Sequence, residues 1–167
     1  CLSLSLSVLI TDQKFTMSQL NEKAIGPTRQ YLDFVFFHAT FPDTFTGNEE
    51  SHMRDVAWLL RIAAAIALLS GIILLAITKS SELRVVAVQS LAVFASIGVL
   101  ALITPFNVIF RVFHLIFFPQ GNWAFPVDST LISFYPQNFF AWYAFSWFAY
   151  SIFTAVVLIF FGRLISR

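Results

Sequence analysis

The chain has 167 residues, a formal net charge of +1, and 58% hydrophobic but only 11% charged residues. Its mean hydropathy is +0.79, whereas soluble domains carry roughly a quarter charged residues, so the composition indicates an integral membrane protein. The near-neutral charge lacks the basic excess that nucleic acid would attract. The single cysteine, Cys1, excludes a disulfide framework and a thiolate zinc site.

The opening stretch CLSLSLSVLI is apolar but too short to cross a bilayer, which takes about 20 residues. We interpret residues 1–10 as the outer end of a further transmembrane helix whose beginning is missing. A cleaved signal peptide is the alternative, but no basic region or small-residue cleavage site is visible.

Residues 11–55 are more polar and are predicted to lie outside the bilayer. Ser18 is the expected N-cap of a helix, with Glu22 further on, and Gly26-Pro27 is expected to break it. The amphipathic stretch TRQYLDFVFF then predicts a short helix against the membrane surface. FPDTFTGNEES is turn material, and a new helix is expected to begin near residues 48–51 and to continue into the bilayer.

Three apolar runs are long enough to span a membrane: residues 56–78, 85–106 and 138–161. The second run extends to residue 118, with a kink expected at Pro105, and residues 119–137 are expected to form a loop. The predicted fold is therefore an all-α polytopic membrane helix bundle of three full transmembrane helices plus the end of a truncated first one. Basic residues mark the cytoplasmic side, which places residues 11–55 and 119–137 on the extracellular side. These basic residues are Lys79, Arg84, Arg163 and Arg167.

The first full span begins with titratable residues, in the stretch NEESHMRDVAWLLR. His52 and Asp55 are three residues apart and are neighbours on one helix face, while Arg54 and Arg61 align on roughly the opposite side. Interactions with the helix dipole and with headgroups explain Arg54 and the acids Glu49 and Glu50. Arg61 lies deeper and needs a partner or a wet cavity.

The second run carries Asn107, Arg111 and His114 on one polar stripe, which is expected to face protein or water. In the loop that follows, Trp123 is a predicted interfacial anchor. Asp128 is expected to pair with Arg111 or to cap a helix.

Several short motifs, in this order and topology, resemble the lipoprotein intramolecular transacylase family, small four-helix membrane enzymes of Gram-positive bacteria. They are HMRDV at the head of a span, FHLIFF followed by GNW.F, and D.TLI.FYPQNFF before the last span. The resemblance implies transfer of the sn-2 acyl chain from the S-diacylglyceryl group of a lipoprotein to the α-amino group of its N-terminal cysteine, giving a lyso-form lipoprotein. It also implies that His52 and His114 are the functional histidines of a multi-pass cell-membrane enzyme whose active site faces outward.

Two histidines suit this chemistry, because an ammonium must lose a proton before it attacks an ester and imidazole has a pKa of about 6.5. Asp55 is expected to orient His52, and Asn107, Asn122 or Arg111 to stabilise the oxyanion. Donor and acceptor belong to one substrate, so no cofactor is expected. The expected partners are diacylglyceryl lipoproteins and membrane lipid, and His38 is expected to be structural.

Other functions stay open at this point. A metal-dependent membrane lipid hydrolase would use His52, Asp55, His114 and Asp128 as ligands, although the HxxD spacing is a weak signal. A transporter would gather polar residues near the membrane midplane, whereas here they gather at one interface. A non-enzymatic membrane scaffold would tolerate loss of both histidines.

Overall fold

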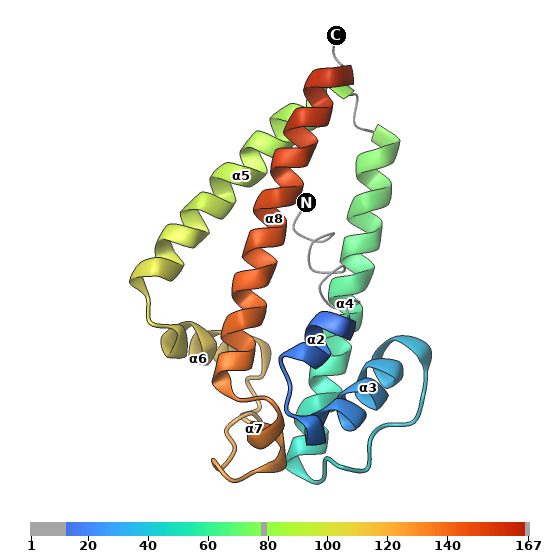
Figure 1. Ribbon diagram of the computed structural model, residues 1–167, viewed down its shortest axis with the longest axis vertical. Coiled ribbons are helices and arrows are strands. Elements are labelled where there is room, and N and C mark those ends of the chain that lie inside the picture. The colour runs from blue at the N-terminus through green and yellow to red at the C-terminus, as the bar shows by residue number, and fades with distance from the viewer. Residues whose placement is uncertain (1–12, 78–79, 166–167) are drawn as a thin grey trace. The chain divides into compact units, whose positions relative to one another are not determined.

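The computed structural model describes residues 13–77 and 80–165 of the chain. All regular secondary structure in these two ranges is helical, which confirms the predicted all-α fold. The predicted helix end at residues 1–10 lies outside the described residues, as do Lys79 and Arg167. The helices, shown in Figure 1, are α2 (Gln13–Ser18), α3 (Glu22–Phe37), α4 (Asn48–Ile77), α5 (Ser80–Ile103), α6 (Phe106–Phe117), α7 (Thr130–Phe134) and α8 (Gln137–Ile165).

Two described helices are long and apolar enough to cross a membrane, α4 over Asn48–Ile73 and α8 over Gln137–Val157. The pair α5 and α6 meets the same test only when both helices are counted together, which gives a third candidate span. The helical chain is interrupted at Thr104 and Pro105, because proline lacks the N–H that continues a helix. The predicted interruption at Pro105 is thus confirmed, and α6 covers the predicted extension toward residue 118, whose place outside the bilayer stays a prediction.

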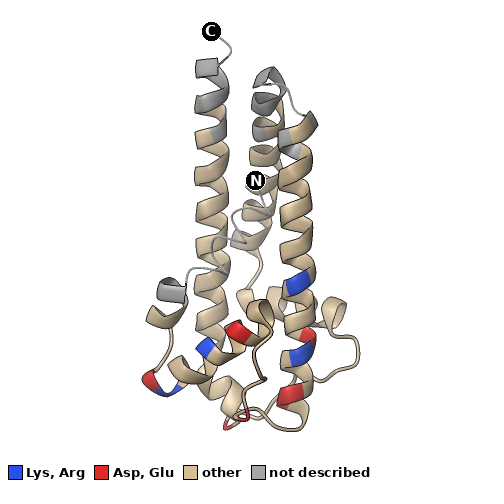
Figure 2. Ribbon diagram, turned by 90° about the vertical axis from the view of Figure 1, so that its right-hand side faces the viewer, with Lys and Arg blue, Asp and Glu red and all other residues tan. Residues whose placement is uncertain are grey.

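The helices belong to two compact units, which we describe separately. Of the described residues, unit 1 contains 64–77, 80–105 and 143–165, and unit 2 contains 13–63 and 106–142. The acidic and basic residues that Figure 2 colours all belong to unit 2. The candidate functional residues are therefore all in unit 2.

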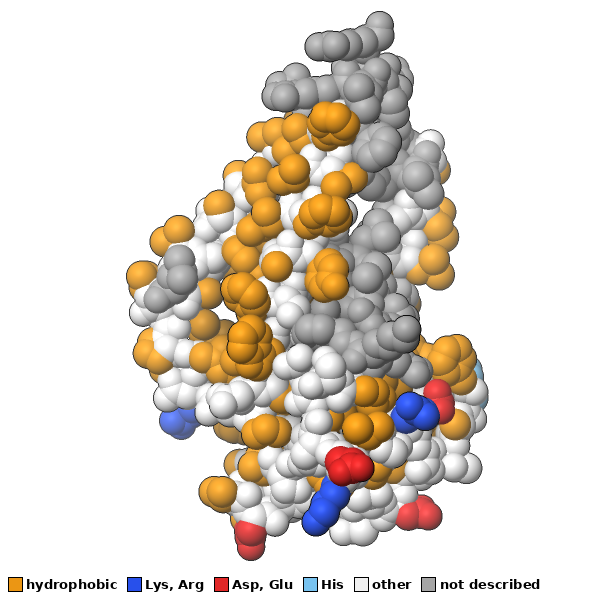
Figure 3. All heavy atoms as spheres, in the orientation of Figure 1, with side chains coloured by type: hydrophobic (Ala, Val, Ile, Leu, Met, Phe, Trp, Pro, Cys, Tyr) orange, Lys and Arg blue, Asp and Glu red, His pale blue; other side chains and the backbone are white. Residues whose placement is uncertain are grey.

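In unit 1, α5 and α8 pack through aromatic and small side chains. The buried Phe94 ring lies 6.1 Å from Trp147 and 5.9 Å from Phe148 between centroids. Gly98 contacts the same Phe148 ring so closely that a Cβ atom at this position would lie 2.4 Å from Phe148 Cζ. Absence of a side chain at Gly98 therefore permits the close helix approach that is common in membranes. Away from this contact the two helices expose hydrophobic side chains (Figure 3), among them Val88, Val93, Val99, Leu100, Phe145, Phe153 and Phe160.

Helix α3 differs from its prediction in two respects. It is capped by Asn21, whose Oδ1 accepts from Ala24 N at 2.9 Å, so the expected cap at Ser18 is wrong. The helix also continues through Pro27, so the expected break at Gly26-Pro27 is wrong. Proline removes one hydrogen bond, which costs about 3 kcal/mol in a helix interior. Burial of one side of α3 compensates, through Ala24, Thr28, Tyr31, Leu32 and Val35.

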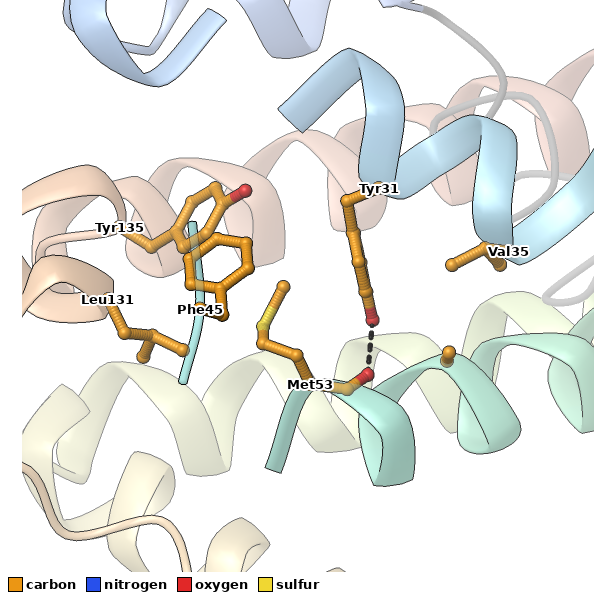
Figure 4. Close-up of a cluster of buried hydrophobic side chains, with 7 residues drawn as sticks. Tyr31, Val35, Phe45, Met53, Leu131 and Tyr135 are labelled. Carbon is orange, nitrogen blue, oxygen red and sulfur yellow. Dashed lines mark hydrogen bonds between the residues drawn. The ribbon is translucent and has the colours of Figure 1, made fainter. Parts of the chain in front are cut away.

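The core of unit 2 holds α3, the start of α4 and α7 together (Figure 4). Its seven buried residues are Tyr31, Val35, Phe45, Met53, Ala57, Leu131 and Tyr135. Tyr31 OH donates a buried hydrogen bond to Met53 O at 2.8 Å. Because Met53 follows His52 directly, this core fixes the turn of α4 that carries the histidine.

Helix α4 begins at Asn48, within the predicted range of residues 48–51. The segment 119–137 contains one helix that was not predicted, α7, with Ser129 as its N-cap. Glu49 Oε1 accepts a hydrogen bond from Leu131 N at 3.0 Å, so an acid at the start of α4 binds the start of α7. Helix α7 is also bound to the start of α3, because Asn21 Nδ2 donates to Ser133 O at 2.9 Å.

Candidate active site

The structure brings His52 and His114 together in unit 2. Their ring centroids are 5.8 Å apart and the rings are inclined by 29°. His52 comes from the second turn of α4 and His114 from the last turn of α6. Both are nearly inaccessible to solvent, with 5% and 6% of their surface exposed.

The orientation of His114 is fixed by its own helix. Its Nδ1 lies 2.7 Å from Phe110 O, and a carbonyl oxygen can only accept, so Nδ1 carries a proton. Neutral His114 therefore has its lone pair on Nε2. This nitrogen is the one that can accept a proton or attack a carbonyl carbon.

Aromatic side chains enclose both imidazoles. The buried Phe118 ring lies 4.6 Å from His52 and 5.4 Å from His114 between centroids. Phe125 lies 5.6 Å from His52, and Trp123 lies 5.0 Å from His114. Such walls exclude water, so a polar interaction inside them is stronger than it would be in bulk solvent.

A polar network lies beside His52, where the turn after α6 meets α4. Asn122 Nδ2 donates to Asp55 Oδ2 at 2.7 Å and to Ser51 Oγ at 3.1 Å. Gln120 Nε2 donates to the same Asp55 oxygen at 2.7 Å. Gly121, between the two amides, has a φ of +80°, a conformation that side chains rarely adopt. The turn therefore needs glycine there to direct both amides at Asp55.

The role predicted for Asp55 needs a correction. Its carboxylate binds the amides of Gln120 and Asn122, and among the residues that the structure describes it has no hydrogen bond to the His52 ring. Two residues that are three apart on a helix lie on the same face, about one turn apart. The direction of each side chain nevertheless depends on its tertiary partners. Asp55 thus holds the turn that carries Asn122.

The remaining predicted residues divide into partnered and unpartnered ones. Arg61 has found a partner, because its Nε donates to Val35 O at 2.9 Å and its Nη2 to Phe34 O at 2.7 Å. These carbonyls end α3, so Arg61 is a helix cap within unit 2. Arg54 forms an ion pair with Glu50 at 2.7 Å, a partner within its own helix that was not predicted.

Arg111 and Asp128 do not pair. Both are exposed, and the described part of the chain contains no ion pair between them. Asn107 is also exposed, so His114 is the buried member of the predicted stripe. Neither Asn107 nor Arg111 forms a hydrogen bond with either histidine in the described structure. His38 ends α3 with a φ of 60°.

The four residues of the metal-hydrolase hypothesis are not assembled as a ligand set. Within residues 13–77 and 80–165 no group of three or more His, Cys, Asp or Glu side chains converges. Asp55 is bound to two amides and Asp128 is exposed. The histidine pair alone is brought together.

A separate cavity of about 350 Å³ lies elsewhere in unit 2 and involves neither histidine. It is lined by Phe41, Pro42, Asp43, Phe45, Thr46, Glu50 and Arg54. The arginine there is already bound to Glu50 and lies 4.5 Å from the Phe41 ring centroid. The charge of Arg54 is therefore already paired within the protein.

Sequence reasoning missed five groups at the site: Ser51, Phe110, Phe118, Gln120 and Phe125. Phe118 ends the motif FHLIFF and Gln120 precedes the GNW motif, so proximity to the motifs was the available signal. The link from Ser51 to Asn122 has no local signal.

Comparison with known proteins agrees with the geometry. The family model for lipoprotein intramolecular transacylase (Lit) matches residues 4–140 of the chain. Searches of curated proteins and of solved structures gave no significant match. The matched region includes both histidines, the polar network and the aromatic walls. The chain therefore belongs to the lipoprotein intramolecular transacylase family and is a lipoprotein transacylase.

Proposed function

We propose that the protein moves the sn-2 acyl chain of an S-diacylglyceryl lipoprotein to the α-amino group of its N-terminal cysteine, with His52 and His114 as the proton-transfer groups. The observation that carries this proposal is the pair of buried imidazoles with centroids 5.8 Å apart. Two adjacent groups that exchange protons near neutral pH match a reaction that needs both a base and an acid.

The proton balance explains why two imidazoles are useful. One imidazole takes a proton from the ammonium, and the amine nitrogen then attacks the sn-2 ester carbonyl carbon. A C–N bond forms and a tetrahedral oxyanion results. As the C–O bond to glycerol breaks, an imidazole moves a second proton from nitrogen to the glycerol oxygen. The products are an N-acyl amide and a free sn-2 hydroxyl, with one proton released to solvent.

His114 is suited to the shuttle step. Its Nδ1–H is bound to Phe110 O, so the ring receives and returns protons through Nε2 without changing its position. A fixed ring reduces the reorganisation that the transition state requires. His52, held by the core residue beside it, is the second proton carrier.

The aromatic walls favour transfer over hydrolysis. Phe118, Trp123 and Phe125 cover the two rings, so few water molecules can compete with the amine for the ester. Exclusion of water also prevents loss of the acyl chain as free fatty acid. The product is then an acyl shift with no change in the total number of chains.

We place the site in the outer leaflet of a multi-pass protein. His52 lies in the polar start of α4, before the apolar stretch that reaches Ile73. Lys79 and Arg84 follow the far end of α4, and Arg163 and Arg167 lie at the far end of the last apolar run. Basic residues in such short connections and tails favour the cytoplasmic side. Lipoproteins carry their diacylglyceryl group on the opposite face.

Coexpression with a diacylated lipoprotein tests the proposal. Mass spectrometry of the N-terminal peptide should show an unchanged acyl count with one chain on nitrogen. The variants H52A and H114A should leave the peptide unaltered, whereas H38N, which keeps a residue that tolerates positive φ, should act like the parent protein. A reduced acyl count, or transfer that persists in both histidine variants, would refute the proposal.

A further inference from the structure

Helix α6 carries a broad apolar face that is exposed. At 3.6 residues per turn, the exposed apolar side chains cover an arc of about 200° around the helix. They are Val108, Val112, Phe113, Leu115, Ile116 and Phe117. The buried residues His114 and Phe118 lie on the other side of the helix. An apolar face of this extent marks a surface that a membrane or another protein covers.

Two observations favour lipid as the cover of this face. The chain belongs to a family of membrane enzymes, and its helices α4 and α8 are long and apolar enough to cross a bilayer. The six exposed side chains are also hydrocarbon throughout, whereas a protein interface includes direct hydrogen bonds and a polar rim. Acyl chains need only such a hydrocarbon surface.

Two polar residues lie along one edge of the apolar face. Arg111 and Asn107 are four residues apart, which places their Cβ atoms about 5–6 Å from each other. Leu115, the first residue of the apolar arc, is about 40° further round the helix than Arg111. Both polar side chains are exposed, and in the part of the chain that the structure describes neither has a hydrogen bond or an ion pair. A charge beside hydrocarbon is unfavourable without a partner, so Arg111 needs an anion from outside the protein.

The position of these groups selects the class of ligand. A guanidinium binds two phosphate oxygens through parallel N–H groups, and an asparagine amide can supply a third donor. A phospholipid has its phosphate directly above its acyl chains, just as the polar edge of α6 lies beside the apolar face. Free phosphate has no chain and would leave the apolar face uncovered.

We infer that α6 binds a membrane phospholipid, with Arg111 and Asn107 on its phosphate and the apolar face against its acyl chains. His114 is buried on the opposite side of the helix, so this lipid is a neighbour of the candidate site and is distinct from the substrate. The bound lipid holds α6 at the level of the headgroups, together with the histidine that the helix carries.

Binding of a defined phospholipid to the purified protein in detergent tests the inference apart from acyl transfer. The probe is dioleoylphosphatidylglycerol, and native mass spectrometry of the lipid adducts gives its affinity. R111Q should bind this lipid about tenfold or more weakly than the parent protein, the size expected for hydrogen bonds between charged groups. R111K keeps a charge that pairs with phosphate and should retain part of the affinity. N107A, which keeps the arginine, should show a smaller loss than R111Q.

R29Q is the matched control, because it removes the same charge from an exposed position on α3. It should bind phosphatidylglycerol like the parent protein. Dioleoylglycerol, which has the chains without the phosphate, should bind equally to the parent protein and to R111Q. Added phosphatidylglycerol should raise the unfolding temperature of the parent protein and of R29Q, and that of R111Q by less. A cooperative unfolding transition of R111Q without lipid shows that the variant is folded.

An affinity for phosphatidylglycerol that is unchanged in R111Q or in N107A would overturn the inference. An equal loss in R29Q would overturn it too, because the lipid would then respond only to the net charge of the protein. Weaker binding of dioleoylglycerol by R111Q would contradict it by assigning Arg111 to the ester. Displacement of the phospholipid by an equal concentration of inorganic phosphate would contradict it by showing a site for the free anion.

Discussion

His114 Nδ1 donates a hydrogen bond to Phe110 O, one turn earlier in α6, at 2.7 Å. The bond uses one of the two ring nitrogens for structure and leaves the other for chemistry. His52 differs, because its Nδ1 is buried without a partner in the described structure. The two imidazoles of the pair are thus prepared differently by the fold.

The variants H114N and H114Q separate these two uses of His114. Asparagine can place an N–H near the position of Nδ1 and keep the bond to Phe110 O, but it cannot take up a proton. We expect both variants to lose acyl transfer by about 100-fold or more, the range for removal of a proton-transfer group. The measurement is the rate of acyl transfer on a diacyl peptide, with each variant in lipid nanodiscs. Substantial activity in H114N alone would mean that His114 serves only to bind its helix.

Arg61 should contribute to stability rather than to catalysis. Its guanidinium binds Phe34 O and Val35 O at the end of α3, and loss of such partners costs about 1–3 kcal/mol. R61M is therefore expected to unfold at a lower temperature in detergent, while each folded molecule keeps its transfer rate. R29M, at an exposed site on α3, should unfold like the parent protein. An R61M protein of full stability but no activity would contradict this role.

Tyr31 should make the folding stability of unit 2 depend on pH. Burial, assisted by Tyr135, raises the pKa of Tyr31 well above its usual value, despite the opposing effect of Arg61. The unfolded chain ionises first, at a pH of about 10, so the contribution to folding stability is complete below that pH and declines as pH rises above it. Chemical unfolding between neutral pH and strongly alkaline pH should show this decline.

Y31F provides the comparison for that measurement. It should lose about 1 kcal/mol at neutral pH, because the hydrogen bond to Met53 O disappears, and its decline above pH 10 should be shallower. Parallel curves for the two proteins would show that Tyr31 ionisation is not responsible.

Gly98 should tolerate no side chain. A Cβ there meets Phe148 Cζ at 2.4 Å, so G98A is expected to destabilise unit 1 by about 1–3 kcal/mol, as overpacking does. G71A is the matched control, since nothing lies within 4 Å of a Cβ at that helical glycine. The unfolding temperature of G98A should lie below that of the parent protein, and that of G71A should equal or exceed it. Recovery in the double variant with F148L would identify the Phe148 ring as the cause.

Local patterns were sufficient for the elements that carry the histidines. Acids before an apolar run predicted the start of α4, and proline chemistry predicted the interruption at Pro105. The helix through Pro27 was not predictable, because its stability comes from tertiary burial of Tyr31 and Val35. The cap at Asn21 is likewise supported by a distant partner, Ser133 O.

The candidate site was likewise predictable only where local sequence determines it. Spacing along α4 identified His52 and Asp55 as neighbours but could not show that Asp55 turns toward Gln120 and Asn122. The distance between His52 and His114 depends on how the chain from α4 to α6 folds back. No periodicity within a single helix contains that information.

The central claim is most directly tested by a single-turnover reaction of the purified protein with a synthetic diacyl peptide whose sn-2 chain alone is isotopically labelled. The account predicts that the label moves to the α-nitrogen, that the sn-1 chain stays on glycerol, and that neither H52A nor H114A transfers it. Label released as free fatty acid, an unlabelled chain on nitrogen, or transfer by either variant would contradict it.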